Sequence, residues 1–134
     1  MLTAMFGFLL IAVVPDVSVD GPSEQFPTVG NNIQLICRYS SSPVASEVQW
    51  EKNGIIISRN DTMENGARGN ITHFNESLVQ LTISASISRD VGNYTCVVIN
   101  TVGNSSDTTA IRGLFLVLMF STFTVSFVTI GVNF

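Results

Sequence analysis

The residues whose chemistry is easiest to predict are Cys37 and Cys96, the only two cysteines of the chain. Both fall on inward-facing positions of predicted strands, and an even cysteine count at such positions predicts a disulfide in a protein that enters the secretory pathway. A zinc site is the alternative, but two cysteines without histidine partners do not supply the ligands of structural zinc. Closing a loop of about 60 residues would stabilise the fold by roughly 4 kcal/mol in the chain-entropy model.

The sequence offers little for catalysis. Its one histidine is His73, so a Ser-His-Asp arrangement would have to be built around that residue, and no nucleophile elbow is present. The segment 66–69 (Gly-Ala-Arg-Gly) is a predicted turn and not a phosphate-binding loop. Glu47 and Glu51 share the outer face of one predicted strand, where we expect them to be solvated. We therefore predict that the protein is not an enzyme and binds no cofactor and no metal.

N-x-[ST] sequons mark candidate glycosylation sites along the middle of the chain. A single sequon arises easily by chance in a sequence rich in Asn, Ser and Thr. Several in one domain, all at predicted turns or strand ends, indicate a glycosylated extracellular surface, and we expect most of them to be occupied. The sequon asparagines are Asn60, Asn70, Asn75, Asn93 and Asn104.

The distribution of charge excludes one class of partner. The chain has a net charge of -4 and no run of like charges, whereas a nucleic-acid surface needs clustered Lys and Arg. Every Asp, Glu, Lys and Arg lies between Asp16 and Arg112, so a polar middle separates two apolar flanks. We therefore expect a protein partner and no nucleic acid.

The polar middle predicts an all-β fold, because short runs alternate apolar and polar residues between Gly, Asn, Ser and Pro clusters. The predicted strands are Gln25–Val29, Asn32–Ser40, Glu47–Lys52, Ile55–Ser58, Asn70–Phe74, Leu78–Ser84, Gly92–Asn100 and Ser105–Arg112. The two-residue period of a strand then assigns each side chain to a face. The inward sets can fill one sandwich interior; they are Ile33, Leu35, Cys37 and Tyr39, then Val48 and Trp50, then Val79, Leu81 and Ile83, then Tyr94, Cys96 and Val98.

Several fixed spacings surround the two cysteines. Trp50 follows Cys37 in the next predicted strand, and the segment Asp90–Cys96 has the form D-x-G-x-Y-x-C. These residues together resemble an immunoglobulin domain. The segment Cys96–Gly103 is similar to the C-x-A-x-N-x-x-G turn of intermediate-set (I-set) domains, although a valine replaces the small residue. The resemblance covers Pro22–Arg112, and its signature residues are Trp50, Leu81, Asp90, Gly92 and Tyr94.

The resemblance implies an immunoglobulin-like sandwich of seven to nine strands, of the kind used in adhesion molecules, receptor ectodomains and matrix proteins. It implies that Trp50 packs on the disulfide and that the Tyr94 hydroxyl meets backbone upstream of it. It also implies an ion pair between Asp90 and an arginine near the start of strand D, for which Arg68 and Arg59 are both candidates.

The apolar N-terminal flank predicts a signal peptide over residues 1–20. Met5–Val14 is an uncharged apolar run that is too short to span a bilayer and has the length of a signal-peptide h-region. A basic n-region and a clear cleavage motif are both absent, so a misassigned start codon and a buried strand are the alternatives. We place the cleavage site within Val14–Gly21.

The C-terminal flank, Leu114–Phe134, predicts a membrane anchor. It has no charged residue, and a helix of this length spans roughly 30 Å, the thickness of a hydrocarbon core. The interpretations are a transmembrane helix, a glycosylphosphatidylinositol signal, and a truncated or mispredicted gene end. A lipid-attachment site at Ser105–Asp107 would cut the last predicted strand off the domain, which favours the transmembrane helix.

One surface is a candidate for binding a partner. On the outer face of the sheet that contains strands C and F, Glu47, Gln49 and Glu51 lie beside Val97 and Ile99, and the next strand adds an isoleucine. An apolar centre with a charged rim predicts a protein contact, and ordinary exposure of single apolar residues is the alternative. The sequons lie mainly at the margins of this face or on the other sheet, so we expect the face to be comparatively bare.

The sequence thus predicts one I-set-like domain at the cell surface, tethered by a single-pass C-terminal helix. Its predicted function is protein recognition, in cell adhesion or receptor-like ligand binding, with a second copy or a different protein as partner. The alternatives are a structural repeat from a fragment of a larger matrix protein and a secreted binder.

Overall fold

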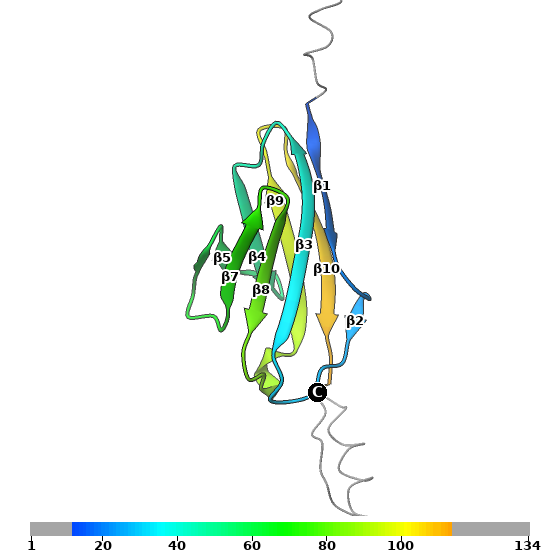
Figure 1. Ribbon diagram of the computed structural model, residues 1–134, viewed down its shortest axis with the longest axis vertical. Coiled ribbons are helices and arrows are strands. Elements are labelled where there is room, and N and C mark those ends of the chain that lie inside the picture. Colours follow the sequence, from blue (N-terminus) through cyan, green and yellow to red (C-terminus); the bar gives the residue numbers. More distant parts are fainter. Residues whose placement is uncertain (1–11, 114–134) are drawn as a thin grey trace, which may run out of the picture.

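The computed structural model describes residues 12–113, which form β-strands and one short 3-10 turn (Figure 1). Each strand predicted from Asn32 onward has a counterpart within one or two residues, because the alternation of apolar and polar residues is clear there. The elements are β1 (Val13–Val19), β2 (Glu24–Gln25), β3 (Ile33–Ser42), β4 (Glu47–Lys52), β5 (Ile55–Arg59), β6 (Thr62–Met63), β7 (Asn70–Asn75), β8 (Leu78–Ile83), η1 (Ser88–Asp90), β9 (Gly92–Ile99) and β10 (Asn104–Ile111).

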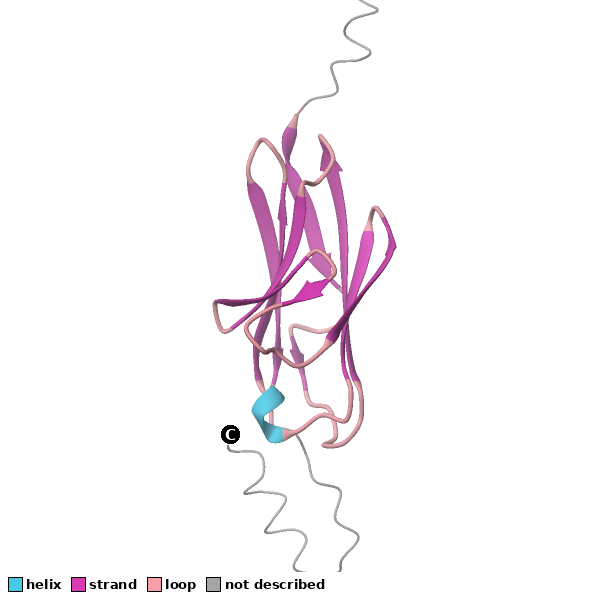
Figure 2. Ribbon diagram, turned by 90° about the vertical axis from the view of Figure 1, so that its left-hand side faces the viewer, coloured by secondary structure: helices cyan, strands magenta, loops and turns pink. Residues whose placement is uncertain are grey.

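The strands make two sheets that face each other (Figure 2). One sheet has the order β1-β3-β8-β7, and the other has the order β2-β10-β9-β4-β5-β6. All neighbouring strands are antiparallel except β2 and β10, which run parallel. The turn η1 lies at the opposite end of the sandwich from the start of β1. The predicted all-β sandwich is confirmed.

The core lies between the sheets and is built from alternate residues of the central strands. The side chains that are most completely buried include Leu35, Trp50, Leu81, Tyr94 and Val98. Each sits at an inward position of the two-residue period. Of the inward side chains that the sequence predicts, Tyr39 is the exception, since it is only partly buried at the edge of the core.

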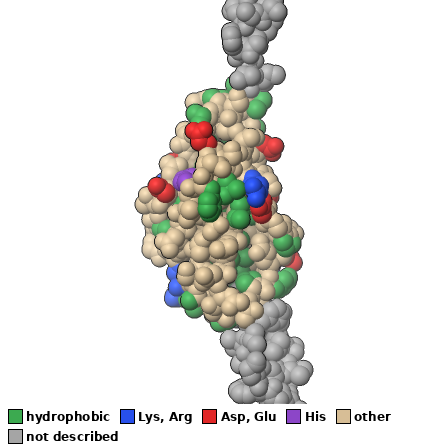
Figure 3. All heavy atoms as spheres, viewed as in Figure 1, with side chains coloured by type: hydrophobic (Ala, Val, Ile, Leu, Met, Phe, Trp, Pro, Cys, Tyr) green, Lys and Arg blue, Asp and Glu red, His purple; other side chains and the backbone are tan. Residues whose placement is uncertain are grey.

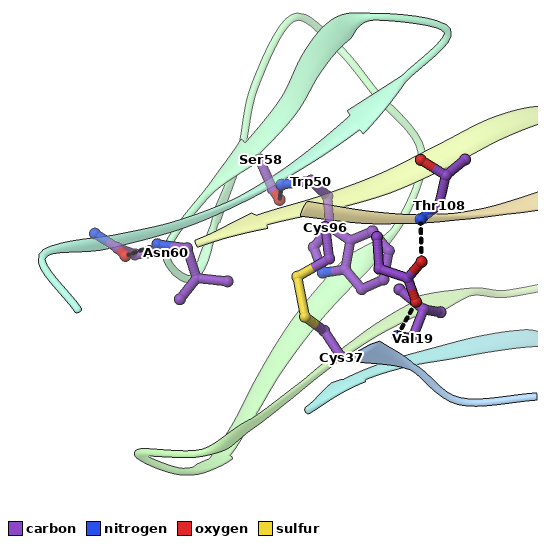
Figure 4. Close-up of a disulfide and its surroundings, with 9 residues drawn as sticks. Val19, Cys37, Trp50, Ser58, Asn60, Cys96 and Thr108 are labelled. Atoms are coloured by element: carbon purple, nitrogen blue, oxygen red, sulfur yellow. Dashed lines mark hydrogen bonds between the residues drawn. A yellow bond between two sulfur atoms is a disulfide. The ribbon is translucent and has the colours of Figure 1, made fainter. Parts of the chain in front are cut away.

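The two sheets are joined by the predicted disulfide between Cys37 in β3 and Cys96 in β9 (Figure 4). Both cysteines and Trp50 have no exposed surface. Trp50 lies directly opposite Cys96 in the pairing of β4 with β9, so its indole ring sits beside the disulfide, as Figure 4 shows. The backbone N–H of Trp50 donates a hydrogen bond to Ser58 Oγ in β5, the neighbouring strand of the same sheet.

The domain begins earlier than the sequence predicts. β1 starts at Val13 and pairs with β3, whereas the predicted boundary lies at Pro22. Pro15 is buried, and Val19 is only 7% exposed. The Val19 N–H also donates a 2.7 Å hydrogen bond to Asp107 in β10 (Figure 4). A cut within the predicted cleavage region, residues 14–21, would therefore divide or remove a strand that belongs to the sandwich.

Two sequence-based predictions fall largely outside the described residues. Most of the apolar run Met5–Val14 precedes residue 12, and the whole tail Leu114–Phe134 follows residue 113. The last strand ends at Ile111, whose side chain is fully buried. Within residues 12–113, no helix has the length and apolar character needed to cross a bilayer.

Candidate protein-recognition surface

Two neighbouring strands, β4 and β9, position the predicted partner surface. In their pairing Glu47 lies opposite Ile99, and Gln49 lies opposite Val97. Residues directly opposite each other in an antiparallel pair point to the same side of the sheet, and Glu51 follows on that side by the two-residue period. The structure therefore brings all of the predicted surface residues to one face. We call it the β4–β9 face, defined by Glu47, Gln49, Glu51, Val97 and Ile99.

The exposure of these side chains is uneven. Val97, Ile99, Glu47 and Glu51 are partly exposed, so a partner could reach them. Gln49, however, is only 8% exposed. Its amide donates a hydrogen bond to the Glu47 carboxylate, so Gln49 acts mainly to hold Glu47 in place.

An arginine that the sequence did not place on this surface fixes the acidic side of the face. Arg59 in β5 lies opposite Gln49, and its guanidinium group contacts the Glu47 carboxylate at 3.2 Å. The same group contacts Glu64 at 3.1 Å. Two carboxylates thus share one arginine, and with Glu51 the region carries an excess of negative charge. The sequence suggested Arg59 only as a candidate partner of Asp90, so this contact was not predicted.

The three isoleucines of β5 point in different directions. Ile57 is buried in the core at 6% exposure, whereas Ile55 is 63% exposed at the start of the strand. Ile56 is partly exposed and lies opposite Glu51. Ile56 therefore shares the β4–β9 face and extends its apolar part toward the edge of the sheet.

All five sequon asparagines are exposed. Asn104 lies directly opposite Ile99 in the pairing of β10 with β9, so its side chain borders the β4–β9 face. Asn93 lies on the same side of β9 as Val97. Two sequon asparagines therefore lie at opposite margins of this face.

The residues of the D-x-G-x-Y motif form a group at the end of the sandwich that carries η1. The Tyr94 hydroxyl donates a 2.6 Å hydrogen bond to the Asp90 carbonyl, which is the upstream backbone contact that the resemblance implies. Burial raises the pKa of this phenol, and the Asp90 carboxylate raises it further, opposed by Arg68. A Cβ atom at Gly92 would lie 3.0 Å from the side chain of Asn53, so glycine permits that close approach.

Asp90 pairs with Arg68, one of the two candidates named from the sequence. The Asp90 side chain is 3% exposed and lies 3.0 Å from Arg68 Nε. The carboxylate also accepts a 2.8 Å hydrogen bond from the Ile87 N–H. Arg59 takes the different role already described, on the outer face of the sheet.

The one histidine of the chain lies on the other sheet. His73 is exposed on the edge strand β7, opposite Val79. Among residues 12–113, no three His, Cys, Asp or Glu side chains come together in a way that could hold a metal ion.

Residues 15–100 match the family model of the immunoglobulin domain. This segment is more than half of the 134-residue chain. The chain belongs to the immunoglobulin-domain family. The predicted family is thus confirmed, while the I-set subtype stays a prediction. The match begins within β1, in agreement with the earlier start of the domain.

This immunoglobulin domain is similar to segments of much longer proteins. It is 31% identical over 97 residues to hemicentin-1 of Homo sapiens, which covers 72% of this chain and 2% of that protein. It is 32% identical over 89 residues to the peroxidasin homolog pxn-2 of Caenorhabditis elegans, covering 66% and 6% of the two chains. It is 32% identical over 84 residues to fasciclin-2 of Schistocerca americana, covering 63% and 8%. The chain therefore spans only a small part of the length of these relatives.

Solved structures agree on the fold. The titin domain M4 superposes with a TM-score of 0.60 at 22% sequence identity, covering 75% of this chain and 96% of that domain. The titin domain M7 gives a TM-score of 0.61 at 20% identity, covering 75% and 94%. At this level of identity the likeness establishes the immunoglobulin sandwich and nothing more specific.

Proposed function

We propose that this immunoglobulin domain recognises another protein outside the cell through its β4–β9 face. Immunoglobulin domains generally bind other proteins, and this chain provides a suitable surface for such a contact. The observation that carries the proposal is the arrangement of Val97 and Ile99 as neighbouring, partly exposed apolar side chains beside a fixed acidic group. An apolar centre with an ordered polar rim is the usual form of a protein interface.

The charge of the face favours one kind of partner. Glu47 and Glu64 share Arg59, and Glu51 lies further along the same face, so the rim is acidic. Two copies docked through this face would bring like charges together, which opposes association. We therefore favour a different protein with Lys or Arg around an apolar centre, and a second copy of this chain is the less favoured partner.

The experiment changes the centre of the face without changing the fold. In Ile99→Arg a long cation replaces a partly exposed strand residue, so the domain should still fold while partner binding is lost. The matched control is Val44→Arg, because Val44 is 69% exposed in the loop between β3 and β4. Full-length chains would be displayed on animal cells. We would test whether these cells aggregate with one another and whether they bind other cells that carry a ligand.

Loss of binding in Ile99→Arg but not in Val44→Arg would support the proposal. Equal binding by both variants and the unaltered chain would refute it, provided that all three reach the surface in similar amounts.

We also propose that the domain is glycosylated and held at the cell surface by its C-terminal segment. Exposure of all five sequon asparagines supports glycosylation. An epitope inserted in the exposed turn at residues 21–23 would be stained on intact cells before and after a phospholipase that cleaves lipid anchors. Label that resists the enzyme means a transmembrane helix, label that is released means a lipid anchor, and label found only in the medium means a secreted binder.

A second candidate function has its own support. The chain spans between 2% and 8% of the relatives named above, which favours a structural repeat from a larger matrix protein. Retention of the full chain inside the cell, with no surface or secreted label, would favour this second candidate.

A further inference from the structure

A small hollow lies at the end of the sandwich where η1 sits, apart from the β4–β9 face. Its volume is about 300 Å³, at the lower end of the range for small-ligand sites. Three cationic side chains line it: Lys52 at the end of β4, Arg68 before β7 and Arg89 in η1. We call it the basic hollow, defined by Lys52, Arg68, Arg89 and the Tyr94 ring beneath them.

Successive side chains of β4 point to opposite faces of the sheet, and this separates the hollow from the partner surface. Glu47, Gln49 and Glu51 point outward, whereas Lys52 has the same parity as Trp50 and points toward the interior side. At the end of the strand the sandwich opens, and Lys52 Nζ lies 5.7 Å from the centre of the Tyr94 ring. The ammonium group also donates a hydrogen bond to the Arg89 carbonyl. The lysine is therefore held over the hollow by an aromatic ring and a backbone acceptor.

The hollow concentrates positive charge on an acidic protein. The chain has a net charge of -4 with six Lys and Arg residues in all, and three of the six line this one hollow. On the face drawn in Figure 3, Lys and Arg side chains are few. One carboxylate, that of Asp90, also lines the hollow, and it neutralises Arg68. No carboxylate of residues 12–113 lies within ion-pair distance of Lys52 or Arg89.

The surroundings of Lys52 show the same excess. Burial lowers the pKa of Lys52, Asp90 raises it, and the positive charges of Arg89 and Arg68 lower it further. An anion placed between Lys52 and Arg89 would offset both the burial and the repulsion. Guanidinium and ammonium groups together suit an oxyanion, because arginine donates two parallel hydrogen bonds and lysine adds a mobile charge.

We propose that the basic hollow binds a sulfate group carried on a sulfated glycan, with Lys52 and Arg89 as its ligands. The anion class follows from the two cations that have no carboxylate of residues 12–113 within ion-pair distance, and the size of the hollow suits a sulfated sugar unit. The choice of a glycan rests on the extracellular location proposed above, where sulfated polysaccharides are the common polyanions. The Arg68–Asp90 pair is a positioning element, since it fixes the loops that carry Ala67 and Arg89.

The test compares two double variants of the full chain, purified in a mild nonionic detergent and bound to immobilised heparin. K52Q/R89Q removes the two cations of the hollow. R38Q/R112Q removes two exposed arginines that pair with Asp20 and Glu24 elsewhere. Both variants have the same charge, because each takes the net charge from -4 to -6. A difference between them therefore reports position and not overall charge.

The hollow variant should bind heparin about tenfold or more weakly, since charge-assisted hydrogen bonds are lost. The control variant should lose less than about threefold, because its cations act only at long range. The slope of log affinity against log salt should fall by about two for the hollow variant, one for each ligand cation. Heparin from which the sulfate groups have been removed should not bind the unaltered chain.

Several outcomes would overturn the proposal. Equal losses in the two double variants would mean diffuse electrostatic attraction. Equal binding of desulfated heparin would exclude the sulfate group as the ligand. Competition by inorganic phosphate as strong as by a sulfated oligosaccharide would exclude the glycan, and binding to phosphatidylserine vesicles without binding to heparin would indicate a membrane instead. Ile99→Arg should bind heparin normally, so failure of this inference and failure of the partner surface are measured separately.

Discussion

The Arg68–Asp90 pair allows a quantitative prediction, because its two partners differ greatly in burial. The Asp90 side chain is 3% exposed, whereas that of Arg68 is 41% exposed. In Arg68→Met the carboxylate stays buried and keeps only the Ile87 N–H as donor. Stranding a buried charge in this way costs about 3 kcal/mol, the low end of the usual range, because water can approach from the arginine side.

Substituting the other partner, Asp90, should lower the free energy of unfolding by less. Asp90→Asn keeps an oxygen that can accept the hydrogen bond from the Ile87 N–H, and Arg68 is exposed enough to be hydrated when its carboxylate is gone. We expect a loss of about 1.5–2 kcal/mol, the low end of what a hydrogen bond to a charged group contributes. The double variant should cost about as much as Asp90→Asn alone, so the cycle should give a coupling energy of about 3 kcal/mol, equal to the cost of Arg68→Met.

The assay is urea and thermal unfolding of the full chain, with Arg38→Met as the matched control. Arg38 pairs with Asp20 at side-chain exposures of 57% and 36%, so that pair should contribute no more than about 1 kcal/mol. A loss of about 3 kcal/mol in a domain of this size lowers Tm by roughly 12 °C or more. If Arg68→Met unfolds no more easily than Arg38→Met, or if the two losses simply add in the double variant, the argument from asymmetric burial is wrong.

Two further predictions concern β1 and the buried phenol. Removing residues 1–19 should lower the stability by about 3 kcal/mol or more relative to removing residues 1–11, because one buried valine and the strand hydrogen bonds are lost, and equal Tm values for the two truncations would contradict this. Because the pKa of Tyr94 is raised in the folded state, the phenol favours folding below its ordinary value of 10.0, and that contribution is lost as the pH rises above it. The stability of the unaltered chain should therefore fall above about pH 10, and Tyr94→Phe should flatten this alkaline loss in urea titrations, whereas an unchanged slope would contradict the assignment.

The strands around the disulfide were predictable from the sequence because local signals agree there. In β3, β8 and β9 every second residue is apolar, and the cysteines, Trp50 and Tyr94 fall on the same inward phase. In a two-sheet sandwich one face of each strand is buried against the other sheet, so every second side chain must be apolar. The sequence could therefore place the core.

β1 was missed for a local reason. Its residues directly follow the apolar run at the N-terminus, so its own apolar positions did not stand out. Pro15 also argues against a central strand, although proline is tolerated on the edge strand that β1 is. The contact that identifies β1, from the Val19 N–H to Asp107, joins residues 88 positions apart, and no local pattern encodes it.

The polar contacts of the candidate sites were only partly predictable. Strand parity brought Glu47 and Ile99 to one face. Whether Arg59 or Arg68 meets Asp90 depends on how the turn at residues 64–69 folds back toward η1, and spacing alone left both open. The basic hollow was invisible for the same reason, because its three cations come from three separate elements.

The two candidate sites depend on a single register. Along β4, Glu47, Gln49 and Glu51 serve the partner surface, while Val48, Trp50 and Lys52 serve the core and the hollow. A slip of one residue would exchange the two sets. The register is fixed where Trp50 lies opposite Cys96 and Lys52 lies opposite Tyr94. The signature residues of the immunoglobulin domain thus decide which side chains face a partner and which face the hollow. A core substitution should therefore weaken partner binding and heparin binding together. Ile99→Arg should weaken only partner binding, and K52Q/R89Q should weaken only heparin binding.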